Sequence, residues 1–196
     1  MSSKQNILFR ADSSSSIGIG HIMRDLVLAK QFEDSNIYFA SLELEGNIIN
    51  RIPYRVIRLN GNTLQELNSL IKELDIDMIV IDHYGIDYEF EKKLKTNNSK
   101  LKILSLDDTY KKHHCDILLN HNISADKKKY KDLVPKSCEL RCGSKYTLLR
   151  DEFIEEKEKK RKDKNSKVKT VFVAMGGADH SNINIKILKV LEKFDN

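Results

Sequence analysis

Short apolar runs alternate with amphipathic segments along the first 120 residues of the chain. The runs are four to seven residues long and nearly all apolar at their centres, which predicts strands that are buried on both faces. They lie at 6–12, 36–42, 54–59, 78–82, 101–106 and 117–120. Helical spacing between them predicts helices that begin near His21 and that span Thr63–Leu74 and Tyr88–Thr96. Strands that alternate with helices are typical of a doubly wound parallel sheet, so the predicted fold class is α/β.

This pattern loosens after Tyr146. Residues 150–169 are highly charged and carry no strand signal, so we interpret them as a connector. The apolar run Thr170–Met175 predicts a further strand. A last helix is predicted from apolar residues that share one face, Ile183, Ile187, Leu191 and Phe194. We therefore predict a first domain over 1–149, a connector over 150–169 and the beginning of a second domain over 170–196.

Composition narrows the class of protein. With 196 residues, 40% of them apolar, the chain can build a real core, and no apolar run reaches the 18 residues of a membrane span. The net charge of +5 is concentrated in residues 155–169, where eight Lys or Arg face four Asp or Glu, which argues against a nucleic-acid surface. The polar first residues show no secretory signal, and three cysteines fit reduced thiols, so we expect a cytoplasmic protein.

Four of the predicted strands end in polar or glycine residues. The first ends in Arg10 and Asp12, the fourth in Asp82, His83 and Tyr84, the fifth in Asp107 and Asp108, and the strand beyond the connector in Gly176 and Gly177. Ligands of open parallel sheets bind at the carboxyl ends of the strands. Any one of these residues could be a helix cap or a loop residue, but four coincident strand ends favour a ligand crevice.

The loop after the first strand is the most informative. Gly18 and Gly20 allow close backbone approach where a helix begins, and helix N-termini favour anions. Met23 stands where a dinucleotide fingerprint has its third glycine, which argues against a nicotinamide or flavin cofactor. The positive end of the helix keeps His21 neutral, as a general base must be. Spacing alone does not distinguish such a base from a histidine that caps or packs.

Two other features have ordinary explanations. Gly176 and Gly177 open the last helix, and a strand-to-helix turn capped by Ser181 or Asn182 accounts for them when they are taken alone. The remaining cluster has the composition of a zinc site and comprises His113, His114, Cys115, Cys138 and Cys142. Only one matched cysteine pair is present, so buried structural thiols explain it better, and we expect no metal.

Six strings together resemble one family, the nucleotide-sugar hydrolases of pseudaminic acid biosynthesis. In the family's order they are RADSSSSIGIGHIMRDLVLA (10–29), IDHYG (81–85), SLDD (105–108), HHCDILLN (113–120), RCGSKYTLLRDEF (141–153) and MGGAD (175–179). The resemblance implies a glycosyltransferase-B-like architecture, with two Rossmann-like halves and the active site between them. It implies cleavage of a UDP-linked 2,4-diacetamido-2,4,6-trideoxy-altropyranose by water, with C–O cleavage and inversion, in a pathway that serves flagellin glycosylation.

The resemblance also implies roles for particular residues. His21 corresponds to the family's loop histidine, the general base, and Tyr84 to the tyrosine that holds the sugar or the water. We predict that the sugar-bearing substrate is bound by Gly18, Gly20, Arg10, Asp12 and Tyr84, and UDP by Gly176, Gly177 and Asp179. No cofactor and no metal is implied. The expected partner is the UDP-sugar, with no nucleic acid and no membrane span.

Family members continue well beyond the equivalent of Asn196, and that further part supplies the uridine and ribose contacts. The chain is therefore a truncated gene product, an expressed part of a longer protein, or a subunit that needs a second chain for the other half. We expect residues 1–196 alone to bind UDP weakly and to hydrolyse the UDP-sugar slowly or not at all. Three alternatives stay open: a glycosyltransferase of the same fold, an inactive fragment of the hydrolase, and a nicotinamide oxidoreductase with Glu43 and Glu45 near a ribose.

Overall fold

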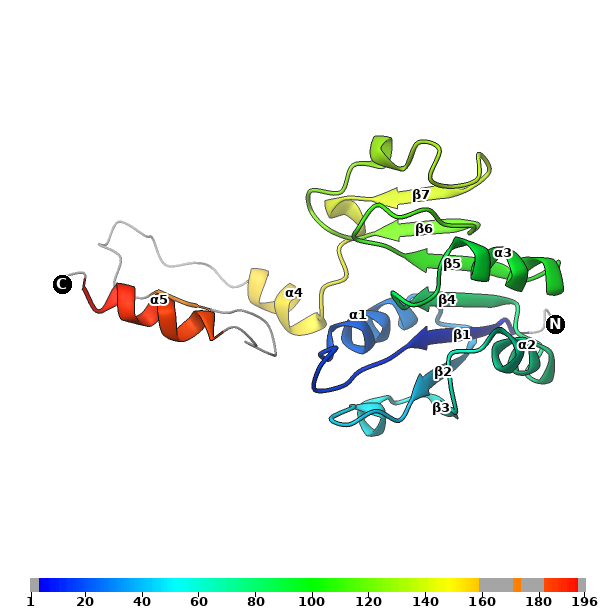
Figure 1. Cartoon of the computed structure of the whole chain (residues 1–196), viewed down its shortest axis with the longest axis horizontal. Helices are drawn as coiled ribbons and strands as arrows, with labels where there is room; N and C mark the ends of the chain where they lie inside the picture. The colour runs from blue at the N-terminus through cyan, green and yellow to red at the C-terminus, as the bar shows by residue number, and fades with distance from the viewer. Residues whose placement is uncertain (1–3, 159–170, 174–181, 194–196) are drawn as a thin grey trace.

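A computed structural model describes residues 4–158, 171–173 and 182–193 of the chain. Its centre is a seven-stranded parallel sheet in the order β3-β2-β1-β4-β5-β6-β7. The strands are β1 (Asn6–Ala11), β2 (Asn36–Leu42), β3 (Arg55–Leu59), β4 (Met78–Asp82), β5 (Lys102–Leu106), β6 (Ile117–Asn120) and β7 (Glu139–Cys142). All the arrows point the same way, toward the end of the sheet where α4 lies (Figure 1). This is a Rossmann-like α/β fold.

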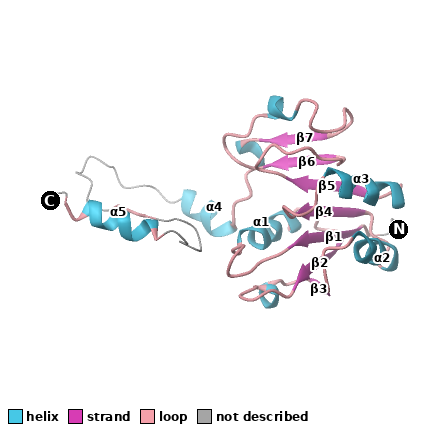
Figure 2. Cartoon of the chain, in the orientation of Figure 1, coloured by secondary structure: helices cyan, strands magenta, loops and turns pink. Residues whose placement is uncertain are grey.

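Helices cover both faces of the sheet (Figure 2). They are α1 (Gly20–Ala29), α2 (Leu64–Glu73) and α3 (Tyr88–Asn97), with short 3₁₀ helices η1 (Ile49–Arg51), η2 (Lys127–Tyr130) and η3 (Ser144–Tyr146). Thr63 and Asp87 cap α2 and α3 by accepting the backbone N–H of Glu66 and Phe90. These caps explain why both helices begin where the sequence predicts.

Alternation along each strand divides the core into two layers. In β1, Ile7 and Phe9 pack with Ile22 of α1 on one face, whereas Leu8 packs with Leu67 of α2 on the other. All five side chains have no exposed surface. A strand buried on both faces must be apolar throughout, which is why the apolar runs identify the central strands so clearly.

The order of the strands places a crevice between β1 and β4. The chain first builds β2 and β3 on one side of β1 and then returns to add β4 on the other. The connections leaving the carboxyl ends of β1 and β4 therefore diverge to opposite faces, which opens a ligand-binding position. The predicted residues after these two strands lie at this point.

The strands and helices predicted for the first 120 residues are confirmed to within about one residue at each end. The sequence reading did not include β7, which pairs in parallel with β6. Two of its four residues are charged, Glu139 and Arg141, and they form an ion pair with each other. The strand therefore has no apolar run. An edge strand needs only one buried face, and the periodic signal is correspondingly weak.

The predicted connector contains a helix, α4 (Asp151–Glu158), whose Asp151 pairs with Lys30 at the end of α1. Of the predicted strand Thr170–Met175, the described residues 171–173 are not in a strand. The last predicted helix is present as α5 (Ile183–Leu191). Gly176, Gly177 and Asp179 lie outside the described residues, as does most of the predicted second half.

Candidate active site at the β1 and β4 strand ends

The loop after β1 is a tight turn that delivers His21 to the crevice. Gly18 has a positive φ of 84°, and its N–H donates to the Ser14 carbonyl at 2.8 Å, which closes the turn. Gly20 is the first residue of α1, and a Cβ added there would meet nothing within 4 Å. His21 thus occupies the first turn of α1, beside open space.

His21 is a half-buried imidazole without a hydrogen-bond partner among the residues that the structure describes. Its ring meets the ring of Tyr84 edge to face, with centroids 5.1 Å apart. Burial lowers its pKa, an effect that the charge of Arg24 reinforces and the carboxylates of Asp82 and Asp108 oppose. A neutral imidazole with free nitrogens can accept a proton, which is what a general base requires.

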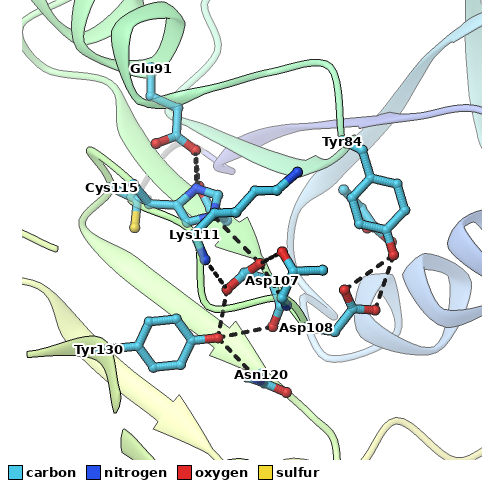
Figure 3. Close-up of polar contacts among 12 residues, drawn as sticks. Tyr84, Glu91, Asp107, Asp108, Lys111, Cys115, Asn120 and Tyr130 are labelled. Atoms are coloured by element: carbon cyan, nitrogen blue, oxygen red, sulfur yellow. Dashed lines mark hydrogen bonds and ion pairs between the residues drawn. The ribbon is translucent and has the colours of Figure 1, made fainter. Parts of the chain in front are cut away.

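Tyr84 stands above the strand end with 57% of its surface exposed. Its hydroxyl donates to the Asp108 carboxylate, 3.1 Å from each oxygen (Figure 3). Burial and the Asp108 carboxylate raise the pKa of the phenol. The contact joins the end of β4 to the end of β5 and fixes the direction of an otherwise exposed side chain.

Arg24 contacts carboxylates at the ends of both β4 and β5, Asp82 and Asp108. It lies one turn after His21 on α1 and forms a bidentate pair with Asp82, with Nε 2.5 Å from Oδ2. Its Nη1 lies 3.6 Å from Asp108 Oδ2 and 3.4 Å from His121 Nε2. Burial opposes the charge of Arg24, but the Asp82 carboxylate outweighs burial and raises its pKa. Bidentate guanidinium–carboxylate pairs are rigid, so α1 and β4 are held in fixed register.

Arg10 and Asp12 lie beneath this crevice rather than in it. Arg10 is 0% and Asp12 1% exposed, and the two form a bidentate pair with contacts of 2.6 and 2.9 Å. Asp12 also accepts the backbone N–H of Leu42 at 2.8 Å. Burial would raise the pKa of Asp12, but hydrogen bonds from His83 and Arg10 hold it well below its ordinary value. In the structure their polar groups pair with each other and with neighbouring groups inside the protein, and contact of either residue with substrate stays a prediction.

His83 completes this buried group. Its Nδ1 accepts the backbone N–H of Gly85 at 3.0 Å, so its Nε2 carries the proton and donates to Asp12 at 3.1 Å. A Cβ at Gly85 would lie 2.8 Å from His83 Cε1, which explains why the position is glycine. Of His21 and His83, His21 is therefore the one with free nitrogens.

Asp107, next to Asp108, is directed inward. It accepts the hydroxyl of Tyr130 at 2.7 Å and lies 3.9 Å from His113 Nε2 (Figure 3). The other nitrogen of His113 lies 2.8 Å from Glu91, which is fully buried. Burial opposes the charge on His113, but Asp107 and Glu91 raise its pKa to about 9. These residues join β5 to α3 and do not face the crevice.

The zinc alternative has no geometric support in the part of the chain that the structure describes. No three His, Cys, Asp or Glu side chains there are arranged to hold a metal ion. Cys115 and Cys138 are free thiols with Sγ atoms 3.7 Å apart, and His113 is engaged with Glu91. Cys115 is buried and Cys138 and Cys142 are half-buried, and their role as structural thiols stays a prediction.

The sequence analysis did not single out three residues of this region as site residues. They are Arg24, Asp25 and His121. Arg24 and His121 could have been suspected only from the three-residue spacing of Arg24 from His21 and from the position of His121 directly after β6. Asp25 is fully buried, and neither of its oxygens has a hydrogen-bond partner among the described residues. Its place in an amphipathic helix gave no signal, because an acidic residue there is normally exposed.

No helix among the described residues is both long and apolar enough to cross a membrane. No protein-family model matches the chain. The chain is 49% identical over 187 residues, 95% of its length, to the UDP-2,4-diacetamido-2,4,6-trideoxy-beta-L-altropyranose hydrolase of Campylobacter jejuni, and covers 66% of that protein. It is 30% identical over 190 residues, 92% of its length, to an uncharacterized protein of Methanocaldococcus jannaschii, of which it covers 38%.

Among solved structures, it matches the dTDP-glucose 4,6-dehydratase of Bacillus anthracis in complex with NAD, with a TM-score of 0.42 and 17% sequence identity. That match covers 55% of this chain and 39% of the dehydratase. The chain thus spans about two thirds of one curated relative and less than half of the other.

Proposed function

We propose that this chain, which belongs to the family of the UDP-2,4-diacetamido-2,4,6-trideoxy-beta-L-altropyranose hydrolases, provides the catalytic half of such a hydrolase. The reaction is the cleavage of the UDP-sugar by water to give UDP and the free sugar. The observation that carries the proposal is His21, a half-buried imidazole with free nitrogens and a lowered pKa, packed against Tyr84 at the β1–β4 crevice.

In the proposed mechanism, water attacks the anomeric carbon of the sugar from the face opposite UDP. A carbon–oxygen bond to water forms, the bond between that carbon and the UDP oxygen breaks, and UDP leaves with the electron pair. The proton lost from water passes to His21. Inversion at the anomeric carbon follows from attack on the opposite face. The backbone N–H groups of the first turn of α1, from Gly20 onward, support this mechanism because they favour the anionic part of the substrate.

The rest of the binding site belongs to the same proposal. Gly176, Gly177 and Asp179 hold the diphosphate, and the uridine contacts come from protein that corresponds to the remaining third of the Campylobacter relative, in the same polypeptide or in a second chain. We place the enzyme in the cytoplasm, which the three free thiols favour, and its product in flagellin glycosylation.

The first experiment supplies the UDP-sugar in ¹⁸O-water without an acceptor. UDP and free sugar should be released, with ¹⁸O in the sugar, because the carbon–oxygen bond breaks. Label in UDP would contradict the proposed bond cleavage. Release of sugar only onto an added acceptor alcohol would indicate a glycosyltransferase.

A second experiment addresses the weak activity that we expect of residues 1–196 alone. The C-terminal third of the Campylobacter hydrolase is appended to the chain, and both proteins are assayed. The chimaera should hydrolyse the UDP-sugar, and His21→Ala should lower its turnover by about a hundredfold. Tyr84→Phe should cost less than His21→Ala. Absence of hydrolysis in both proteins would refute the proposal.

A further inference from the structure

Tyr84 has an exposed ring, but the hydrogen of its hydroxyl is already used in a hydrogen bond to Asp108. The ring is 57% exposed, yet both oxygens of Asp108 lie 3.1 Å from the hydroxyl oxygen. A carboxylate has only acceptors, and a phenol has one hydrogen, so Tyr84 is the donor in this contact. The remaining lone pairs of the Tyr84 oxygen can only accept a hydrogen bond from whatever enters the crevice.

We propose, on the basis of the proposed hydrolase function, that Asp108 is a positioning residue that makes Tyr84 a hydrogen-bond acceptor toward the attacking water. A water molecule has two hydrogens. His21 takes one of them as a base. The other is donated in a hydrogen bond to the Tyr84 oxygen and stays covalently bound to the water oxygen, which becomes the sugar hydroxyl. With both hydrogens directed at the protein, a lone pair of the water faces the anomeric carbon.

The surroundings hold Asp108 in this role. Arg24 Nη1 lies 3.6 Å from Asp108 Oδ2 and balances its charge, while Asp82 fixes the guanidinium from the other side. Lys111 Nζ lies 5.7 Å from the centre of the Tyr84 ring and adds a cation over that ring. Two of these groups come from α1 and β4, the elements that carry His21 and Tyr84. The base and the acceptor are therefore positioned by one connected set of contacts.

The same contact identifies the chemistry of the bound group, which must be a hydrogen-bond donor. Two groups of the reaction qualify: the attacking water and an amide N–H of a diacetamido sugar. The edge-to-face contact between His21 and Tyr84, with ring centroids 5.1 Å apart, favours water, because a single small molecule can reach the polar atoms of both rings. Kinetics separate the two, since water orientation affects kcat and an amide contact affects KM.

The test uses Asp108→Asn. Arg24 attracts the carbonyl oxygen of the new amide, so its NH₂ group faces Tyr84 and donates to the hydroxyl. Tyr84 then turns its own hydrogen toward the crevice and ceases to be an acceptor. Asp34→Asn is the matched control, because Asp34 is exposed and precedes β2, at the opposite end of the sheet.

The first measurement needs no substrate. The phenol pKa of Tyr84 is followed by NMR of ¹³C-labelled tyrosine in the full chain, with Tyr84→Phe to assign the signal. Because Asp108 raises this pKa, Asp108→Asn should lower it, and Asp34→Asn should leave it unchanged. An unchanged pKa in Asp108→Asn would show that Asp108 does not control Tyr84, and would overturn the inference.

The second measurement is hydrolysis of the UDP-sugar by the chimaera that carries the C-terminal third of the Campylobacter hydrolase. Asp108→Asn should lower kcat about tenfold to a hundredfold with KM unchanged, and Asp108→Glu should restore part of the loss because it keeps a carboxylate. A rise in KM alone would show that Tyr84 accepts a hydrogen bond from an amide of the sugar instead of from water, and would overturn the water-orienting role. Unchanged kcat and KM would overturn any role of Asp108 in the reaction. If neither the wild-type chain nor the chimaera released sugar, the hydrolase function and the water-orienting role would fail together, and the Tyr84 titration would still decide the Asp108 contact.

Discussion

His83 donates its Nε2–H to the buried carboxylate of Asp12 at 3.1 Å, while its Nδ1 accepts the backbone N–H of Gly85. Both nitrogens of this histidine are therefore occupied, although it directly precedes Tyr84 in the sequence. We expect His83→Gln to lower the free energy of unfolding by about 1–3 kcal/mol, because the Asp12 carboxylate loses a buried donor. Turnover of the folded variant should stay within about tenfold of wild type.

The matched comparison is His21→Gln, which removes the proposed base and no buried hydrogen bond. It should leave urea unfolding close to wild type and lower turnover by about a hundredfold. If the two variants exchanged these phenotypes, the base would be His83 and the assignment of His21 would be wrong.

Burial is the main cause of the lowered pKa of His21, and Arg24 adds to it. Its positive charge helps to lower the His21 pKa, and it neutralises Asp82, whose charge acts in the opposite direction. Arg24→Met removes the cation and leaves the carboxylate unpaired, so the His21 pKa should rise. NMR titration of the imidazole, assigned with His21→Asn, measures this. Arg58→Met, which breaks an exposed pair with Glu43, is the control and should not move it.

Asp25 is a buried carboxyl group that destabilises the fold at neutral pH. Burial raises its pKa well above the ordinary value, and the charge of Asp82 raises it further. A group whose pKa is higher in the folded state supports stability at pH values below its unfolded pKa, and this support is lost as the pH rises toward the folded value. Asp25→Asn should therefore stabilise the protein by about 1 kcal/mol or more at pH 8, and by less at pH 5.

Urea unfolding at the two pH values measures the effect, with Asp34→Asn as the exposed control. An equal change in stability at pH 5 and pH 8 would show that Asp25 does not titrate differently in the folded and unfolded states.

The buried pair of His113 and Glu91 should make stability fall in alkaline solution. The pKa of His113 is raised to about 9 in the folded protein. The stabilisation is thus complete below about pH 6.5, the unfolded value, and is lost as the pH rises through 9. Between pH 7 and pH 10, wild type should lose about 2 kcal/mol more than His113→Gln. His114→Gln, which leaves the pair intact, should lose as much as wild type.

The sequence by itself determined the elements of the first half of the chain. A strand buried on both faces must be apolar along most of its length, so β1 and β4 appear as short runs in which apolar residues dominate. The same constraint places polar residues only where these strands end, which is why His21 and Tyr84 could be singled out. β7 escaped because Glu139 and Arg141, on an edge strand, satisfy no such constraint.

The tertiary structure decided which of those polar residues face the crevice. Arg10 lies near the end of β1 and Asp12 directly after it, at the start of the loop that leads to His21. The two residues nevertheless pair with each other below the surface. The contact of Tyr84 with Asp108 joins residues 24 positions apart, and it exists because β5 lies beside β4 in the sheet. Side-chain direction and pairing depend on neighbours brought together by strand order, and local sequence carries no record of that order.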